Sequence, residues 1–221
     1  MRESEADHTT VVAVLAAFIR ENASISQPST RDERDPTPVA NPSELGAQQH
    51  EPKPDTDVQA ALTVLARRPE RSEPDYIDLS NTDLRGADLR WARLEGAQLK
   101  EAWLHYANLS AADLKGAFLR GTQFQHAWLV NAQLKDADLI NAQFEHANLG
   151  GAQLQDADLR KAQLRQAHLR RANLSSSYLT GACLEDAYLV DAQLRNAHLA
   201  GVDKWARQHE INRLPLWGKE R

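Results

Sequence analysis

Residues 77–101 read IDLSN, TDLRG, ADLRW, ARLEG, AQLKE, and the same five-residue unit continues without interruption to AHLAG at 197–201. The middle residue of each unit is Leu, except where Phe124 and Phe144 replace it, and Ala stands two places before most of these centres. A period of five fits neither a helix, which repeats at about 3.6 residues, nor a flat strand, which repeats at two. The pattern therefore predicts a chain that turns once per unit and points every centre residue at a common axis.

The tandem A(D/N)LXX units over residues 77–201 resemble the pentapeptide-repeat family, whose motif is highly specific. The resemblance implies a mainly β fold, a right-handed quadrilateral β-helix in which four units make one coil, so that this chain forms about six coils with short flanking α-helices. Residues 20 apart should then stack at the cross-strand spacing of about 4.8 Å. This places Phe124 directly against Phe144. The structural core that we expect includes Leu79, Leu99, Leu119, Phe124, Leu139, Phe144, Leu159, Leu179 and Leu199.

Three segments of different composition precede the repeat. Residues 1–25 contain an amphipathic helix over 9–21, with Thr9 or Thr10 as the expected N-cap. Residues 26–55 are rich in Pro, Ser and charged residues, which is typical of a flexible linker. Residues 56–76 hold a second expected helix, capped by Thr56 or Asp57, and the lead-in to the repeat.

A solenoid exposes its apolar core at both ends and needs caps there. We expect the helix over 56–67, which Pro69 stops, to cover the first coil with Val58, Ala61, Leu62 and Leu65. Residues 202–221 break the pattern and are expected to form a C-terminal cap or tail. The alternative is that the last coil pairs with a second copy of the chain, which would give a homodimer.

The order of these segments is also similar to a group of actinobacterial pentapeptide-repeat proteins, in which they usually follow a membrane-spanning stretch. The longest apolar run here, residues 11–19, is far shorter than the roughly 20 residues that a membrane span needs. We therefore expect no membrane insertion by this chain. The single cysteine, Cys183, and the absence of a signal-peptide pattern favour a cytoplasmic location.

No motif for catalysis, phosphate binding or a cofactor is present, which predicts a protein that is not an enzyme. His126 and His146, 20 residues apart, should stack at a corner near His105. Zinc needs three or four ligands, and Glu145 is the only obvious third, so we expect no metal site.

Binding remains as the function class, and protein is the expected partner. Trp103 and Trp128 precede centres and point outward, so they are candidate partner contacts. Val11, Leu15 and Phe18, on one face of the first helix with Ile19, are further candidates for docking on a partner or a second copy. Counting in fours places Trp103, Phe118 and Trp128 on three different sides of the solenoid.

Two alternative functions are open. Some family members imitate duplex DNA and bind gyrase, which requires a strongly acidic prism. Residues 77–201 hold 14 acidic and 13 basic residues, although the whole chain has a net charge of −5. Direct nucleic-acid binding is not expected, because the basic cluster of Arg160, Lys161, Arg165, Arg170 and Arg171 spreads over several sides. The other alternative is a peripheral role in a membrane complex, which rests on the longer relatives alone.

Overall fold

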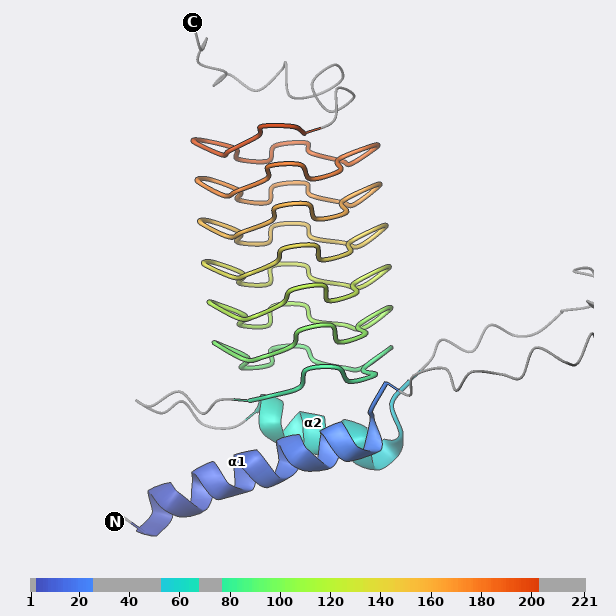
Figure 1. The fold of residues 1–221 in the computed structure, drawn as a ribbon, viewed down its shortest axis with the longest axis vertical. Coiled ribbons are helices and arrows are strands. Elements are labelled where there is room, and N and C mark those ends of the chain that lie inside the picture. Colours follow the sequence, from blue (N-terminus) through green and yellow to red (C-terminus); the bar gives the residue numbers. More distant parts are fainter. Residues whose placement is uncertain (1–2, 26–52, 68–76, 203–221) are drawn as a thin grey trace, which may run out of the picture.

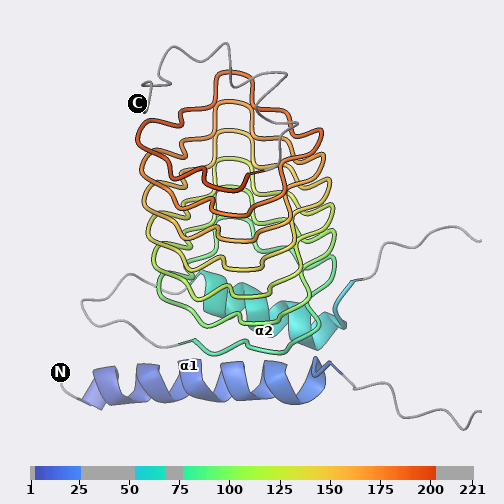
Figure 2. The same cartoon turned by 45° about the horizontal axis from the view of Figure 1, so that its top comes forward.

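The computed structural model describes residues 3–25, 53–67 and 77–202 of the chain. Helix α1 (Glu3–Asn22) and helix α2 (Thr56–Ala66) come first in the sequence, and the repeat then winds into a stack of coils. Figure 1 shows the stack standing on α2, with α1 at the same end. The coils have squared corners when the stack is tilted forward (Figure 2). The molecule is thus a straight column with one helical end.

Backbone pairing between coils occurs at a constant separation of 20 residues. Parallel bridges join Asp78 to Gln98, Trp103 to Gln123, and so on along the repeat, so four pentapeptides complete one coil. These are isolated one-residue bridges, and residues 77–202 contain no extended strand. The expected mainly β content is therefore corrected to single bridges, because a turn interrupts the backbone in every unit. The right-handed winding and the number of coils stay predictions.

Each corner is a tight turn with a left-handed residue. The carbonyl of a centre accepts a hydrogen bond from the amide three residues later, as from Ala87 to Leu84 at 3.1 Å. The second residue after every centre has a φ between 55° and 71°. Gly, Asn and Asp, which tolerate this conformation best, hold most of these positions.

The interior is a continuous apolar column. The centres and the alanines two places before them are almost all fully buried. The rings of Phe124 and Phe144 are parallel, with centroids 4.8 Å apart, which confirms the predicted stack. Of the core residues expected from the sequence, Leu199 differs in being only partly buried, because it lies in the last described coil.

The residues paired 20 apart form four bridge ladders along the solenoid. Helix α2 supplies the hydrogen-bond partners at the start of two of these ladders, at the first coil. The side-chain amide of Gln59 donates to the carbonyl of Asp88 and accepts from its amide, both at 3.0 Å. The carbonyl of Ala66 accepts a hydrogen bond from the amide of Arg93 at 3.0 Å. The predicted apolar stripe of α2 is buried under the coil: Val58, Ala61, Leu62 and Leu65.

Helix α1 ends the other two ladders. Arg20 donates to the carbonyl of Asp78 at 3.2 Å and forms an ion pair with its carboxylate at 2.7 Å. Beyond the helix, Ser24 forms an antiparallel bridge with Thr82, and the amide of Asp83 donates to the carbonyl of Ala23 at 2.6 Å. The two helices together therefore supply the first coil with the hydrogen-bond partners that a preceding coil would give.

The helix boundaries differ from those expected. Helix α1 begins at Glu3, so Thr9 and Thr10 lie inside it, since acidic residues are also favourable in a first helical turn. The N-cap of α2 is Asp55, not Thr56 or Asp57. Pro69, most of the expected linker and residues 203–221 lie outside the described residues. Within the described ranges, neither helix is long and apolar enough to cross a bilayer.

Candidate interaction surface

Each repeat unit places three side chains on the outside: the residue before the centre and the two after it. Because paired residues are 20 apart, these side chains form columns on four sides of the solenoid. One side is made of residues 87–91, 107–111, 127–131, 147–151, 167–171 and 187–191. We call it the Trp128 face.

The Trp128 face carries more exposed large hydrophobic side chains than any other side of the described repeat. Trp91 is 75% exposed, Trp128 54%, Tyr188 52% and Val190 47%. The ring of Tyr188 stacks on His168 at 4.6 Å, which fixes its orientation. These side chains lie in the first, third and sixth layers of the face, and exposed apolar residues on one side can mark a binding surface.

Charge is absent from the middle of this face. The units at 107–111 (ANLSA), 127–131 (AWLVN) and 147–151 (ANLGG) contain no ionisable side chain. Charged residues lie toward the two ends: Arg90 pairs with Asp88 at 2.6 Å at one end, and Arg170 and Arg171 lie at the other, where Arg171 is 3.7 Å from Asp191. A partner can therefore cover the middle of the Trp128 face without removing a charge from water.

Polar groups in the middle are already bonded within their own unit. The Asn108 carboxamide oxygen accepts hydrogen bonds from the amide and hydroxyl of Ser110, at 3.1 and 2.7 Å. The carboxamide oxygen of Asn148 accepts from the amide of Gly150 at 3.1 Å. Covering these side chains would therefore leave few hydrogen bonds unmade.

The other sides are dominated by local ion pairs. Asp158 shows the pattern: burial raises its pKa, but hydrogen bonds and charge from Arg160 outweigh burial and hold the pKa below its ordinary value. Phe118 and Tyr178 share one column, yet Asp138 and Asp158 stand between them. The shortest ion pairs within the repeat on these sides are Arg85–Asp83 and Arg160–Asp158 at 2.6 Å, Arg120–Asp138 at 2.8 Å and Lys115–Asp113 at 3.1 Å.

Sequence comparison agrees with this geometry. A family model for pentapeptide repeats matches, in 8 copies, residues 75–100, 92–127, 119–152 and 152–189, which together span more than half of the chain. The chain belongs to the pentapeptide-repeat family.

Several solved structures are similar to this pentapeptide-repeat protein. HetL, a pentapeptide repeat protein involved in heterocyst differentiation regulation from the cyanobacterium Nostoc sp. strain PCC 7120, is 32% identical over 57% of this chain and 73% of its own, with a TM-score of 0.38. A pentapeptide repeat protein of the Arabidopsis thaliana thylakoid lumen is 32% identical over 43% of this chain and 63% of its own, with a TM-score of 0.35. QnrB1, a plasmid-mediated fluoroquinolone resistance protein, is 21% identical over 58% of this chain and 76% of its own, with a TM-score of 0.25. No curated protein matches the chain.

The two tryptophans that the sequence singled out have different surroundings. Trp128 lies in the middle of its exposed face. Trp103 is half-buried on the adjoining side, where the Arg85 guanidinium lies 5.3 Å from its ring and the His105 ring meets it edge-on. The structure therefore does not bring Trp103 and Trp128 together, and side chains of its own chain already contact Trp103.

The expected docking face of the first helix is largely turned inward. Leu15 and Phe18 are half-buried against the core at the first coil, and Ile19 is fully buried. Only Val11, at 51%, is well exposed. The helix thus turns Leu15 and Phe18 partly toward its own solenoid, and partner docking by Val11, Leu15 and Phe18 stays a prediction.

Trp91 is the most exposed large hydrophobic residue among those described, and it is not among the candidate contacts expected from the sequence. Those candidates are aromatic residues before the centres, whereas Trp91 is the second residue after one. At this corner position its φ is 62°, a conformation uncommon for a bulky residue. A tryptophan at a turn position, where Gly, Asn and Asp are common, was the feature of the sequence that could have marked Trp91 as an exposed residue.

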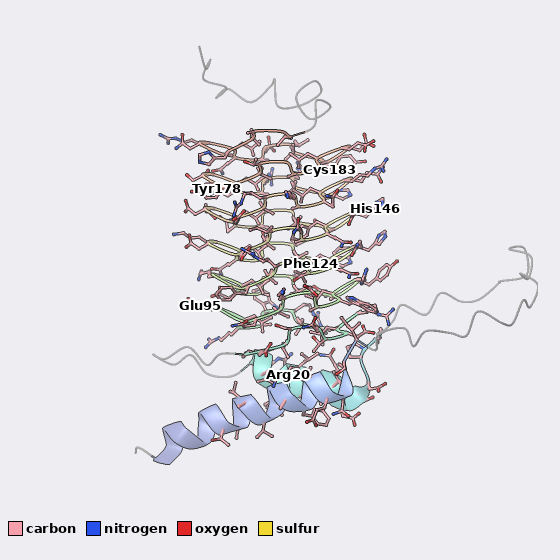
Figure 3. The ribbon with its side chains drawn as sticks, viewed as in Figure 1. Arg20, Glu95, Phe124, His146, Tyr178 and Cys183 are labelled. Atoms are coloured by element: carbon pink, nitrogen blue, oxygen red, sulfur yellow. The ribbon has the colours of Figure 1, made fainter. Side chains whose placement is uncertain are left out.

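A column of rings occupies one corner of the solenoid. Tyr106 stacks on His126 at 5.0 Å, and His126 stacks on His146 at 4.8 Å, as predicted for the histidines. Burial, followed by the neighbouring His146, lowers the pKa of His126. In Figure 3, His146 and Tyr178 lie on the outside of the stack, and Phe124 lies within it. Among the described residues, no three metal-ligating side chains come together.

A small cavity of about 200 Å³ lies where the chain leaves α1 and enters α2. Its lining includes Lys53, Asp55, Asp83 and Arg85. Asp83 and Arg85 are joined by an ion pair at 2.6 Å, so the charged groups of the first coil satisfy each other. The cavity belongs to the junction of the cap and is smaller than most ligand sites.

Proposed function

We propose that this pentapeptide-repeat protein is a non-enzymatic scaffold that binds another protein through the Trp128 face. The observation that carries the proposal is the composition of that face, with Trp91, Trp128 and Tyr188 exposed around an uncharged middle and arginines toward the ends. Trp, Tyr and Arg are the residues enriched at binding hot spots, and the centres of interfaces are depleted in charge.

Rigidity of the column supports the same function. Each coil is bonded to the next at all four sides, as in the amide-to-carbonyl bonds from Leu109 to Trp128 and from Trp128 to Ala107. The backbone that carries the exposed rings therefore loses little conformational freedom when a partner binds. A flat face held in this way suits recognition of a structured protein surface.

The alternative of a DNA-mimicking gyrase regulator has weaker support. Duplex DNA carries one negative charge per roughly 1.7 Å of its length. Residues 77–201 are nearly neutral, and many of their carboxylates, including those of Asp83, Asp138 and Asp158, are paired with arginines. The membrane-complex alternative rests on relatives alone, and no described side chain favours it.

Affinity capture with matched variants tests the proposal. The full chain, Trp128→Asp and Phe118→Asp are each used as bait at about 0.1 µM, so that capture selects proteins that bind with a Kd near or below this concentration. Phe118 is the control because it is a similarly exposed aromatic residue before a centre on another side. We expect one set of proteins to be retained by the wild-type chain and by Phe118→Asp, and lost with Trp128→Asp. Capture that is unchanged by Trp128→Asp would contradict the proposal.

A further inference from the structure

Bulky and small layers alternate over the first five layers of the Trp128 face, and the sixth, 187–191, is again bulky with Tyr188 and Val190 exposed. The layer at 107–111 exposes Asn108, Ser110 and Ala111, all half-buried, and the layer at 147–151 exposes Asn148, Gly150 and Gly151 in the same way. The layers at 87–91, 127–131 and 167–171 instead carry large exposed side chains: Arg90 and Trp91, Trp128, and His168, Arg170 and Arg171. With coils about 4.8 Å apart, the face has ridges about 10 Å apart with recesses between them.

In the recess at 147–151, the left-handed backbone of Gly151 and the neighbouring Asn side chains disfavour a larger residue. A Cβ atom on Gly151 would lie 2.4 Å from the Asn131 carboxamide oxygen of the coil below, and the φ of Gly151 is 71°. A Cβ atom on Gly150 would lie 3.2 Å from the Asn148 carboxamide oxygen, which already accepts the Gly150 amide. The layer at 147–151 is therefore a built depression next to the ridge of Trp128.

This pattern is complementary to itself. Two copies can be related by a two-fold axis that lies in the contact plane. The axis is perpendicular to the long axis of the solenoid and passes midway between the layers of Trp128 and Asn148. Each lengthwise row of side chains on the face then lies against the same row of the second copy, with the layers in reverse order. Trp128 then faces Asn148 of the second copy, Val130 faces Gly150, and Ala111 faces Arg171. In each of these pairs a large side chain meets a small one.

We propose that the Trp128 face binds a second copy of this chain, with the two columns antiparallel and ridge set into recess. The inference rests on the proposed function, because it names the partner of that same surface. At the ends, the bulky first layer meets the bulky sixth, so ridge and recess interlock in the four inner layers. Arg90 keeps its ion pair with Asp88 at 2.6 Å, and Asp191 stays 3.7 Å from Arg171. Interlocking shapes in an uncharged middle are a feature of specific interfaces.

The size of the face sets the strength of the complex. Six layers at about 4.8 Å give a face roughly 30 Å tall, and a width of about 15 to 20 Å leaves roughly 1,000 Å² buried in total. That area is at the low end for a specific complex, so the homodimer is expected to dissociate in the micromolar range.

Sedimentation velocity on the full chain, from about 1 to about 200 µM, tests the pairing through a double-mutant cycle. Trp128→Asn removes a ridge and Asn148→Trp fills a recess, so each is expected to weaken self-association at least tenfold. The double variant exchanges ridge and recess, and antiparallel pairing predicts recovery to within about threefold of the wild-type Kd. Phe118→Asn, on another side, should leave the Kd unchanged.

Thermal melts show whether each variant is folded. If Asn148→Trp is not, the cycle is run with Gly150→Arg and Val130→Gly, the facing pair in the next row, since Arg170 occupies the position equivalent to Gly150 one coil away. A chain that stays monomeric at about 200 µM, or a double variant no better than the weaker single one, overturns the homodimer. The capture experiment runs at a concentration where this homodimer is dissociated. Its result therefore judges binding to other proteins separately from self-association.

Discussion

At the scale of single residues, the corner position imposes the largest local demand. Every corner residue has a positive φ, including the non-glycine residues Trp91, Glu101 and Lys161. An L-residue with a Cβ atom is destabilised in this conformation by about 1–2 kcal/mol relative to the right-handed one. The sequence places Gly, Asn or Asp at most corners, but the five-residue period alone does not reveal which position must be left-handed.

Glycine at a corner should therefore stabilise the solenoid. Ala111, with a φ of 56°, is the simplest site because its side chain is a single methyl group. We expect Ala111→Gly to raise the free energy of unfolding by about 0.5–1 kcal/mol, the strain relieved less the entropy that glycine adds to the unfolded chain. The reverse change, Gly116→Ala, should lower it, since a Cβ atom there meets nothing within 4 Å and strain alone acts. Urea unfolding measures both, and a destabilised Ala111→Gly would contradict the turn geometry.

Histidines next to the ring column make stability depend on pH. Burial and the nearby Arg85 lower the pKa of His105, on which Asp83 acts in the opposite direction, and burial and His146 lower the pKa of His126. The unfolded chain therefore binds protons on these rings at a higher pH than the folded chain does. Their contribution to stability is complete above the ordinary histidine pKa of about 6.5 and decreases as the pH falls below it.

The melting temperature should consequently fall between about pH 7 and pH 5. Replacing both rings, as His105→Gln with His126→Gln, should flatten that slope, and glutamine is tolerated in both columns at Gln125 and Gln166. Differential scanning calorimetry across this range compares the two proteins. An equal slope of melting temperature against pH in the wild-type chain and the double variant would show that these histidines do not cause the slope.

At the scale of elements, the helices replace a missing coil. Arg20, Ala23, Gln59 and Ala66 each provide a hydrogen-bond partner to one of the four ladders. The apolar pattern was enough to predict both helices and the buried stripe of α2. It was not enough to predict that α1 shares the cap, because which ladder each helix ends depends on the docking of two segments far apart in the sequence.

Gln59 tests the cap most cleanly, since its carboxamide imitates a neighbouring backbone at Asp88. Gln59→Ala should lower the free energy of unfolding by about 1–3 kcal/mol, because two hydrogen bonds are lost and the amide and carbonyl of Asp88 are left unpaired. Gln98→Ala, an exposed glutamine on the solenoid, should change it by less than about 0.5 kcal/mol. Equal effects of the two substitutions in chemical denaturation would show that Gln59 is not a capping residue.

At the scale of the whole molecule, the four sides of the column are not equivalent. The repeat period predicted that Trp103, Phe118 and Trp128 lie on different sides, and the bridge pattern confirms it. What the period did not predict is that Trp91, Trp128, Tyr188 and Val190 share one side, because Trp91 and Val190 lie after their centres. The side on which each exposed residue lies became clear only when the residues after the centres were assigned to sides together with the residues before them.

In this proposal, one side of the solenoid binds its partner and the other three remain solvated. Hydroxyl-radical footprinting of the full chain tests this claim with control residues inside the same molecule. The chain is compared free at low concentration and then in the complex, either with a captured protein or with a second copy. We predict that oxidation decreases at Trp91, Trp128 and Tyr188 in the complex and is unchanged at Phe118, Tyr178 and Tyr106, which are also exposed. Protection of Phe118 and Tyr178 with Trp128 still fully reactive would contradict the claim.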